Sequence, residues 1–199
     1  MTYDFEKIAE MMWSEAPIVI FDLETTGFGR DDKIVEFGAV IMEGNRVTAE
    51  MHHLINPGRP IPAETTAVHN ITDEMVKDAP RWRDVARECY DFLFVGLPII
   101  SHNFSFDSRM LAQQVDPKHW PKNIYTLCTM VEARKRGHKG RAKLTELAEH
   151  YNLEYDTEHA ALSDSIVTGL LARRFTGTNV VSRYYTKTTG EWAEALIGR

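Results

Sequence analysis

The sequence of 199 residues contains few cysteines, no long apolar run and fewer basic than acidic residues. Its two cysteines, Cys89 and Cys128, occur in no Cys-x-x-Cys or Cys/His spacing, which argues against a zinc site or a disulfide scaffold and favours a reducing compartment. No apolar run approaches the ~20 residues of a membrane-spanning helix, and residues 1–15 lack the apolar segment of a signal peptide. We therefore expect a soluble, cytoplasmic protein with no membrane partner, whose cysteines pack in the core.

The charge balance is acidic, because 23 Lys and Arg residues oppose 29 Asp and Glu residues and leave a formal net charge of -6. This balance argues against an extended electrostatic grip on duplex DNA or on an anionic membrane. It is compatible with a short nucleic-acid end, especially where acidic residues hold divalent cations that themselves attract phosphate. A chain of this length and composition is stable without metal or disulfide, so any metal would serve chemistry.

The hydrophobic pattern predicts an α/β fold in which helices flank a mixed, five-stranded sheet. Turn signals join the first three strands into an antiparallel meander, and the expected strands are residues 17–21, 34–42, 46–55, 98–100 and 124–128. Helices are expected to start near residues 72 and 105 and to cover residues 82–94, 144–151 and 160–175. The predicted domain covers residues 1–175, with its core from about residue 17. Residues 176–199 would form a C-terminal extension, either a docking helix or an oligomer contact.

Acidic residues follow two of the predicted strands. Asp22 and Glu24 lie two apart at the carboxyl end of the first strand, so the two-residue period of a strand puts both on one face. Asp107 follows the fourth strand, in the first turn of the next helix, where the helix dipole favours a carboxylate in any case. Surface acids that end a strand or start a helix would explain each residue alone. The alternative is a shared site, because open α/β sheets bind ligands at the carboxyl ends of strands.

A third group lies at the start of the last predicted helix. His159 and Asp164 are five residues apart, or about 140° around a helix axis, so they could not face one point from a single continuous helix. His159 is therefore expected just before the helix and Asp164 inside it. Histidine side chains in general titrate near neutral pH, which suits a loop histidine to accept a proton from water. A surface histidine is the commoner explanation when such a residue stands alone.

Together, the carboxylates indicate a metal site. At an effective dielectric constant of ~20, two like charges ~4 Å apart repel by roughly 4 kcal/mol, which bound cations would relieve. Oxygen ligands favour Mg²⁺ or Mn²⁺ over zinc, and two such ions ~3.5–4 Å apart can activate water and stabilise the leaving oxygen in phosphodiester cleavage. We therefore expect two Mg²⁺ ions, for which Mn²⁺ could substitute, at four ligands: Asp22, Glu24, Asp107 and Asp164.

Three motifs in register carry a resemblance to a known family. Asp22-Leu-Glu-Thr-Thr-Gly27, His102-Asn-Phe-Ser-Phe-Asp107 and His159-x-Ala-x-x-Asp164 resemble the exonuclease motifs of the DEDDh 3′→5′ exonucleases, over residues 17–175. This family includes the proofreading subunit of bacterial replicative polymerase, exonuclease X, ribonuclease T and oligoribonuclease. His69-Asn-Ile-Thr72 also resembles the His-Gly-Ile-Thr element of that family, with Asn70 in place of the usual glycine.

The resemblance implies a ribonuclease H-like fold, two metal ions held by the four carboxylates, and His159 as the general base. It also implies that residues near the terminal nucleotide bind substrate, namely Thr25, Thr26, Gly27, Phe28, His69, His102, Asn103 and Phe106. Taken by themselves, Gly27 permits a tight turn and the two threonines can donate hydrogen bonds. Phe28 and Phe106 could stack on a base or pack in the core, and the core is the slightly favoured place for both.

Residues 134–143 contain six basic residues in an otherwise acidic chain. Such a run is usually a solvated face. Its position between the second and third motifs makes contact with substrate phosphates an alternative, in which Arg136, Lys139 and Arg141 would take part.

We therefore expect a metal-dependent 3′→5′ exonuclease that releases nucleoside monophosphates, with single-stranded DNA as the favoured substrate and a polymerase or a second copy of the chain as candidate partner. An exoribonuclease or RNA-trimming enzyme would carry the same motifs, because recognition of the 2′-hydroxyl is local. An aspartyl-phosphate phosphatase would use an Asp-x-Asp strand end, which Glu24 and the late His159/Asp164 pair argue against. A catalytically idle polymerase-accessory module is disfavoured because all five expected catalytic residues are present.

Overall fold

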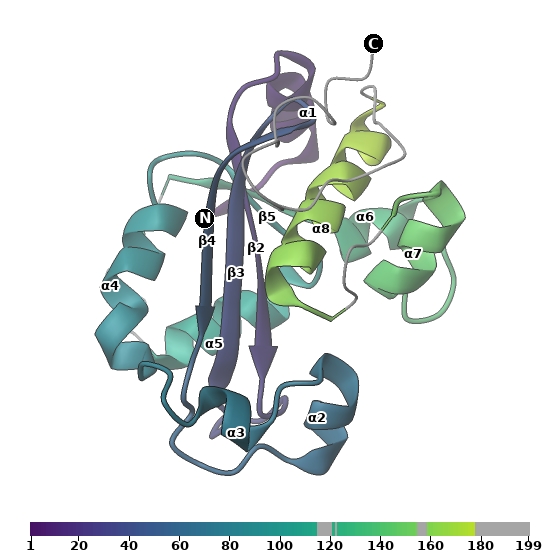
Figure 1. Cartoon of the computed structure of the whole chain (residues 1–199). Coiled ribbons are helices and arrows are strands. Elements are labelled where there is room, and N and C mark those ends of the chain that lie inside the picture. Colours follow the sequence, from purple (N-terminus) through teal and green to yellow (C-terminus); the bar gives the residue numbers. More distant parts are fainter. Residues whose placement is uncertain (115–120, 122, 155–158, 178–199) are drawn as a thin grey trace.

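Apolar residues on both sides of the central strands let helices cover each face of the sheet. The computed structural model describes residues 1–114, 121, 123–154 and 159–177. Its sheet has the strand order β1-β6-β5-β2-β3-β4. The strands are β1 (Thr2–Tyr3), β2 (Ile18–Thr25), β3 (Ile34–Glu43), β4 (Arg46–Leu54), β5 (Ile99–Ser101) and β6 (Tyr125–Cys128). As predicted, β2, β3 and β4 form an antiparallel meander, whereas β5, β6 and β1 pair in parallel (Figure 1).

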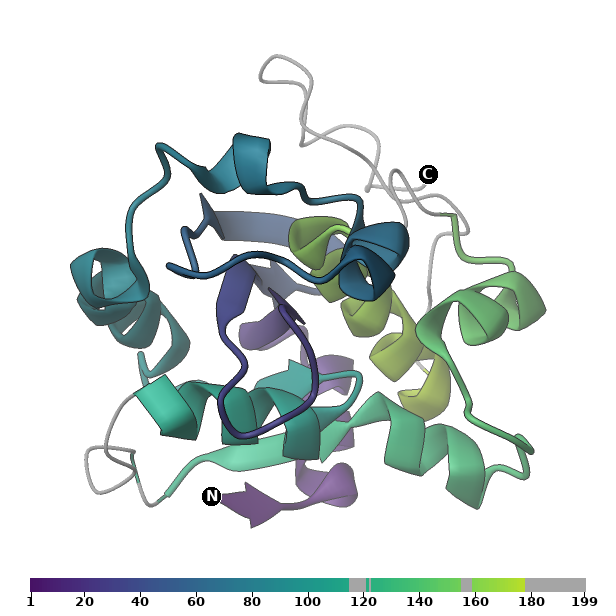
Figure 2. The same cartoon turned by 90° about the horizontal axis from the view of Figure 1, so that it is seen from below.

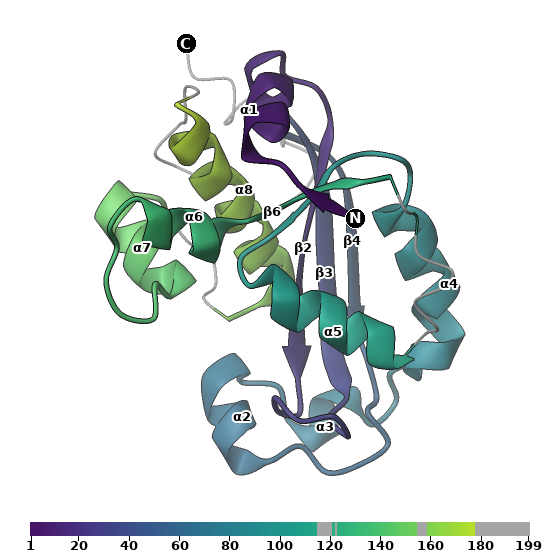
Figure 3. The ribbon, with the colours of Figure 1, turned by 180° about the vertical axis from the view of Figure 1, so that it is seen from behind.

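Two layers of helices enclose the sheet. In chain order they are α1 (Phe5–Trp13), α2 (Ala63–His69), α3 (Asp73–Val76), α4 (Trp82–Leu93), α5 (Phe104–Gln114), α6 (Thr129–Lys135), α7 (Leu144–Tyr151) and α8 (Ala161–Thr176). Ile18 and Ile20 of β2 face the layer of α1, α7 and α8, whereas Val19 and Phe21 face α4 and α5. Figure 3 shows α5 crossing the sheet on this second face. Figure 2 views the end of the sheet at which β2 terminates, with α2 and α3 beside it.

The described chain differs from the predicted elements mainly at its amino-terminal end. The sheet has six strands where five were expected, because β1 has two residues and is too short to give a pattern. The sequence does carry a signal for α1, since Phe5, Ile8 and Met12 recur at helical spacing and Asp4 accepts a hydrogen bond from Lys7 N at 2.9 Å as the N-cap. Ile8 and Met12 are buried, so the core begins before residue 17.

The strand that carries the first motif is longer than expected. The apolar run predicted a strand over residues 17–21, but β2 continues to Thr25. It does so because it pairs with β3 along its whole length, with Thr25 opposite Ile34 and a bulge between Glu24 and Thr25. Helices α2 and α6 were also not predicted, whereas the other expected elements lie close to their observed positions.

Three smaller expectations concern the rest of the chain. Cys89 and Cys128 are free and buried, as expected. Among the described residues, no helix combines the length and the apolar character that crossing a membrane requires. Residues 178–199 lie outside the described residues, so a docking helix or oligomer contact in the C-terminal extension stays a prediction.

Helix α8 lies unusually close to β3. A Cβ atom on Gly38 of β3 would overlap the backbone atoms of Ala161 and Leu162, so only glycine lets the first turn of α8 rest on the strand. Ser165, one turn further on, is fully buried and its Oγ lies 3.0 Å from Gly38 O. The first turn of α8 is thereby fixed on the sheet.

Gly38→Ala is expected to lower the free energy of unfolding by about 1–3 kcal/mol, the usual cost of forcing extra atoms into a packed interior. Denaturant unfolding measures this change, and hydrogen exchange should show faster exchange in the first turn of α8. Gly96→Ala is the control for exchange in α8, because nothing lies within 4 Å of its Cβ position; its φ of +89° makes any loss of stability one of local backbone strain. Unchanged stability and exchange in Gly38→Ala would contradict the close packing.

Candidate active site

Four carboxylates from three separate stretches of chain meet at the carboxyl end of β2. Asp22 and Glu24 lie on β2, on the side of the strand that Ile20 presents to α8. Asp107 lies in the first turn of α5, directly after β5, which pairs in parallel with β2. Asp164 lies in the first turn of α8. The crossover that the sequence suggested between the first and fourth predicted strands is therefore present.

The pKa values of these carboxyl groups reflect their closeness. Burial is the largest cause that raises the pKa of Asp22, and the other three carboxylates add to it, with Asp107 contributing most. The pKa of Glu24 is raised to about 9 by burial and next by the charge of Asp164. Burial likewise raises the pKa of Asp107 to about 7. Without a counter-charge, the ionised cluster is unfavourable.

His159 lies outside the helix, as the angular argument predicted. It precedes α8 by two residues and has a left-handed backbone, with φ of 55°. Ala160 then returns to an extended conformation before the helix begins. With this turn in the backbone, ligand atoms of Glu24, His159 and Asp164 all lie within 4.8 Å of one another.

This donor set fits a hard divalent cation. Carboxylate oxygens make up most of it, and they favour Mg²⁺ or Mn²⁺ over zinc. A cation among them would also offset the repulsion that raises the pKa of Asp22 and Glu24. The residues present are therefore suited to hold the expected metal.

A fifth acidic residue, Glu36, was not predicted to lie here. It stands opposite Glu24 in the β2–β3 register and is only 6% exposed. Its charge contributes to the raised pKa of both Asp22 and Glu24. Its Oε2 accepts a hydrogen bond from Ala161 N at 2.9 Å, and its Oε1 lies 2.6 Å from His52 Nε2. A single charge inside the apolar run of β3 was the signal that could have revealed it.

The loop after β2 is fixed by its own hydrogen bonds. Thr25 Oγ1 donates to Gly27 O and Thr26 Oγ1 donates to Asp32 Oδ1, both at 2.8 Å. A Cβ atom on Gly27 would lie 2.6 Å from Asp32 Oδ2, so this close approach requires glycine. The two hydroxyl groups that the sequence offered to a substrate therefore donate within the loop. Substrate contacts by these residues stay predictions.

An exposed aromatic pair follows this loop. Phe28 is 76% exposed, so the expectation that it packs in the core is wrong. Its ring centroid lies 5.4 Å from that of Phe106, which is half-buried. Arg109 of α5 donates from Nη1 to Phe28 O at 3.0 Å, and its guanidinium lies 5.5 Å from the Phe106 ring centroid. The two rings form a platform of the kind on which bases stack.

His102 is held inside the fold by both ring nitrogens. Nε2 donates to Ala142 O at 2.9 Å, so Nδ1 accepts from the Thr129 hydroxyl at 2.8 Å. Burial lowers the pKa of His102 to about 4, which keeps the ring neutral. Asn103, the next residue, is half-buried. His102 thus links the second motif to the basic residues 134–143 rather than presenting a free ring nitrogen.

His69 ends α2 and is 5% exposed. Burial lowers its pKa, and the nearby backbone of Thr25 and the charge of Glu36 oppose this change, while its Nδ1 accepts a hydrogen bond from Ile71 N at 3.0 Å. His69 therefore lies beside the end of β2, where the resemblance implied it. Asn70 caps α2 with φ of 61°, a left-handed conformation that asparagine tolerates better than most residues, which explains its presence at a usual glycine.

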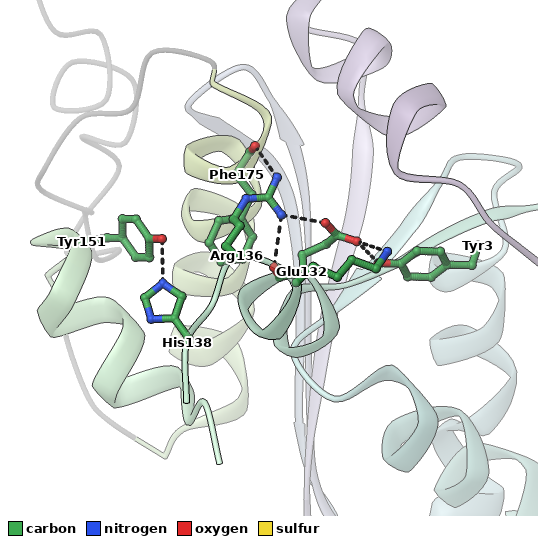
Figure 4. A network of polar contacts seen from close by, with 7 residues as sticks. Tyr3, Glu132, Arg136, His138, Tyr151 and Phe175 are labelled. Atoms are coloured by element: carbon green, nitrogen blue, oxygen red, sulfur yellow. Dashed lines mark hydrogen bonds and ion pairs between the residues drawn. The ribbon is translucent and has the colours of Figure 1, made fainter. Parts of the chain in front are cut away.

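Two residues of the basic stretch, Lys135 and Arg136, pair with the buried Glu132. Arg136 pairs with Glu132 Oε2 at 2.6 Å and donates to Phe175 O at 2.9 Å (Figure 4). Its guanidinium also lies 4.7 Å from the Phe175 ring centroid. Glu132 is buried and also pairs with Lys135 at 2.7 Å. Arg136 therefore donates within the fold, and its contact with phosphate stays a prediction. All six basic residues of the stretch are exposed, namely Arg134, Lys135, Arg136, Lys139, Arg141 and Lys143.

Sequence comparisons place the chain among exonucleases. The family model described as Exonuclease, RNase_T, matches residues 19–171. The chain is 34% identical over 185 residues to a DNA polymerase III subunit epsilon-like protein of Rhodobacter capsulatus, covering 84% of this chain and 26% of that protein. It is 33% identical over 171 residues to the uncharacterized exonuclease CP81 of Escherichia phage 186, covering 78% of this chain and 86% of that protein. The chain thus spans only about a quarter of the Rhodobacter relative.

Solved structures agree with the sequence comparisons. Exonuclease X in complex with 5′-overhanging duplex DNA is similar with a TM-score of 0.64 and 28% identity, over 82% of this chain and 95% of that chain. The nuclease domain of 3′hExo, a DEDDh family member bound to rAMP, has a TM-score of 0.65 at 18% identity, over 81% and 92% of the two chains. These neighbours confirm the ribonuclease H-like fold. The chain therefore belongs to the exonuclease family.

Proposed function

We propose that this chain is a metal-dependent 3′→5′ exonuclease that releases nucleoside monophosphates from nucleic-acid 3′ ends, with single-stranded DNA favoured. The observation that carries the proposal is the convergence of four buried or half-buried carboxylates from β2, α5 and α8. Such a cluster is unfavourable unless cations offset it. His159 lies next to the same cluster, where a proton acceptor is needed.

Each group has a separate task in the proposed reaction. Asp22, Glu24, Asp107 and Asp164 would hold two Mg²⁺ ions, for which Mn²⁺ could substitute. The bound cations would supply stabilisation of the negative charge that develops on the phosphate oxygens. His159 accepts the proton of the attacking water, a role that its place outside α8 leaves it free to perform. Phe28 and Phe106 stack on the bases near the 3′ end.

The relatives support a nucleic-acid end as substrate. Exonuclease X was solved with duplex DNA and 3′hExo with rAMP, so an RNA substrate is the second candidate for this chain. Base stacking on Phe28 and Phe106 is available to DNA and RNA alike. The epsilon-like relatives favour a polymerase as partner. A second copy of the chain as partner and a cytoplasmic location stay predictions.

His159→Ala and Asp164→Asn are expected to lower kcat by ~10²-fold or more, the usual effect of losing a general base or an equivalent group, while oligonucleotide binding survives. The assay follows 5′-labelled DNA and RNA strands with Mg²⁺ or with chelator, and binding is measured separately by fluorescence anisotropy. Wild-type protein should shorten strands from the 3′ end when Mg²⁺ is present, and should not shorten them when chelator is present.

Glu43→Gln is the matched control, because Glu43 is exposed at the far end of β3 and should leave the rate unchanged. A strand with a 3′-phosphate should resist digestion. Ready cleavage of a circular strand would exclude an exonuclease, and full activity of Asp164→Asn would exclude the assigned site.

The raised pKa values make the stability of the cation-free protein depend on pH. Carboxyl groups with a higher pKa in the folded than in the unfolded chain stabilise the fold fully below ~pH 4. This contribution is lost as the pH rises through about 7 for Asp107 and about 9 for Glu24. In chelator, the Tm should therefore fall across this window. Mg²⁺ should raise the Tm most at its upper end.

Glu24→Gln removes one of the titrating groups at nearly constant size, so its Tm should fall less across the same window. Scanning calorimetry with chelator and with Mg²⁺ measures both effects. Identical pH profiles for wild type and Glu24→Gln, or no Mg²⁺ effect at any pH, would disagree with this account of the acids.

Replacing Lys139 and Arg141 by Gln should raise the KM for an oligonucleotide and flatten its dependence on salt, because each lost phosphate contact lowers the number of released counterions. The kcat should stay unchanged. Arg136→Gln should instead lower the Tm, since it breaks the contacts to Glu132 and Phe175. An unchanged KM after replacement of Lys139 and Arg141 would contradict the phosphate contact, and residues 134–143 would then be a solvated face only.

A further inference from the structure

Glu36 differs from the four expected metal ligands in what its carboxylate contacts. Both of its carboxylate oxygens are already engaged by the protein, Oε2 by Ala161 N and Oε1 by His52 Nε2. Among the described residues, the group with ligand atoms within 4.8 Å of one another contains Glu24, His159 and Asp164, and not Glu36. Its carboxylate faces the start of α8.

The start of α8 lacks a cap of its own. The N-cap residue is Ala160, whose methyl group cannot accept a hydrogen bond from the exposed N–H groups of the first turn. Glu36 supplies this acceptor from the neighbouring strand, because its Oε2 reaches Ala161 N. The bond to Ala161 N is buried, so water does not replace it readily.

A second contact fixes the same turn two residues further along β3. Gly38 lets the backbone of Ala161 rest on the strand, and Ser165 Oγ lies 2.7 Å from Ala161 O of its own helix and 3.0 Å from Gly38 O of the strand. Asp164 lies between these two attachments in the chain. The position of its carboxylate relative to β2 therefore depends on how β3 holds the first turn of α8.

We propose that Glu36 is a positioning residue: its carboxylate anchors Ala161 and thereby sets Asp164 against the acids of β2. This inference rests on the proposed function, because it assigns to Glu36 the geometry of that metal site. The anchoring works through the reach of a hydrogen-bond acceptor and not through charge. His159, two residues before Ala161, is held by the same anchor.

Two substitutions separate the effect of the length of the Glu36 side chain from the effect of its charge. Glu36→Gln keeps the length and one acceptor oxygen but removes the charge, whereas Glu36→Asp keeps the charge but shortens the side chain by one methylene. The affinity for Mn²⁺ is measured by isothermal titration calorimetry without substrate, and kcat and KM with a labelled oligonucleotide. The same substitutions at exposed Glu43 on the same strand serve as controls.

Glu36→Asp should weaken Mn²⁺ binding by about tenfold, the upper end of what one intramolecular hydrogen bond supplies. It should lower kcat and leave KM unchanged, while Glu36→Gln should stay near wild type in all three. Wild-type behaviour of Glu36→Asp, or a larger loss in Glu36→Gln than in Glu36→Asp, would overturn the proposal.

Circular dichroism checks that the variants fold. Should Glu36→Asp fail to fold, Glu36→Met carries the test, since it keeps the length of the side chain but removes the acceptor. It should weaken Mn²⁺ binding without changing KM, and unchanged Mn²⁺ affinity would overturn the anchoring. If the wild type binds Mn²⁺ but shortens neither DNA nor RNA, the proposed function fails, while the Mn²⁺ affinities still decide the role of Glu36.

Discussion

Mutual repulsion among buried carboxylates is the constraint on which the rest of this structure depends. Asp22 and Glu24 share one face because a strand presents alternate residues to the same side. Asp107 and Asp164 come from helix starts, where backbone N–H groups and the helix dipole favour negative charge. Burial raises the pKa of Asp22, Glu24 and Asp107, so solvent screens this repulsion little. The fold thus maintains a charge arrangement that an unfolded chain would disperse.

Helix α8 is the element through which this arrangement is tied to the rest of the molecule. Its first turn carries Asp164 and lies against β3. Its last turn accepts hydrogen bonds from two distant parts of the chain, with Phe175 O bound by Arg136 and Thr176 O bound by Trp13 Nε1. The amino-terminal helix and the basic stretch are therefore both attached to the helix that supplies one of the acids.

The local periodicities were enough to predict much of the fold and the meeting of the acids. The period of two placed Asp22 beside Glu24, and the helical angle placed His159 outside α8. Features that depend on register or on partners distant in sequence were not predictable in this way. Glu36 became visible at the site only once β2 and β3 were paired.

Two further features were not predictable for the same reason. Residue type alone favoured the core for Phe28, but its surroundings depend on the fold of the loop after β2. Arg136 was counted with the basic stretch, because nothing in the local sequence shows that Phe175 and the buried Glu132 take up its donors. The surroundings of Phe28 and of Arg136 therefore depend on residues from other helices and strands.

The structure of the loop that carries Phe28 has a consequence for the binding of a nucleic-acid end. Asp32 accepts a hydrogen bond from Thr26 and Arg109 of α5 donates to the Phe28 carbonyl, so the backbone that carries the exposed ring is held by the fold itself. The entropy of ordering that loop is lost during folding and need not be lost again upon association. Every base offers a π-face to such a ring, so this grip would be indifferent to nucleotide identity.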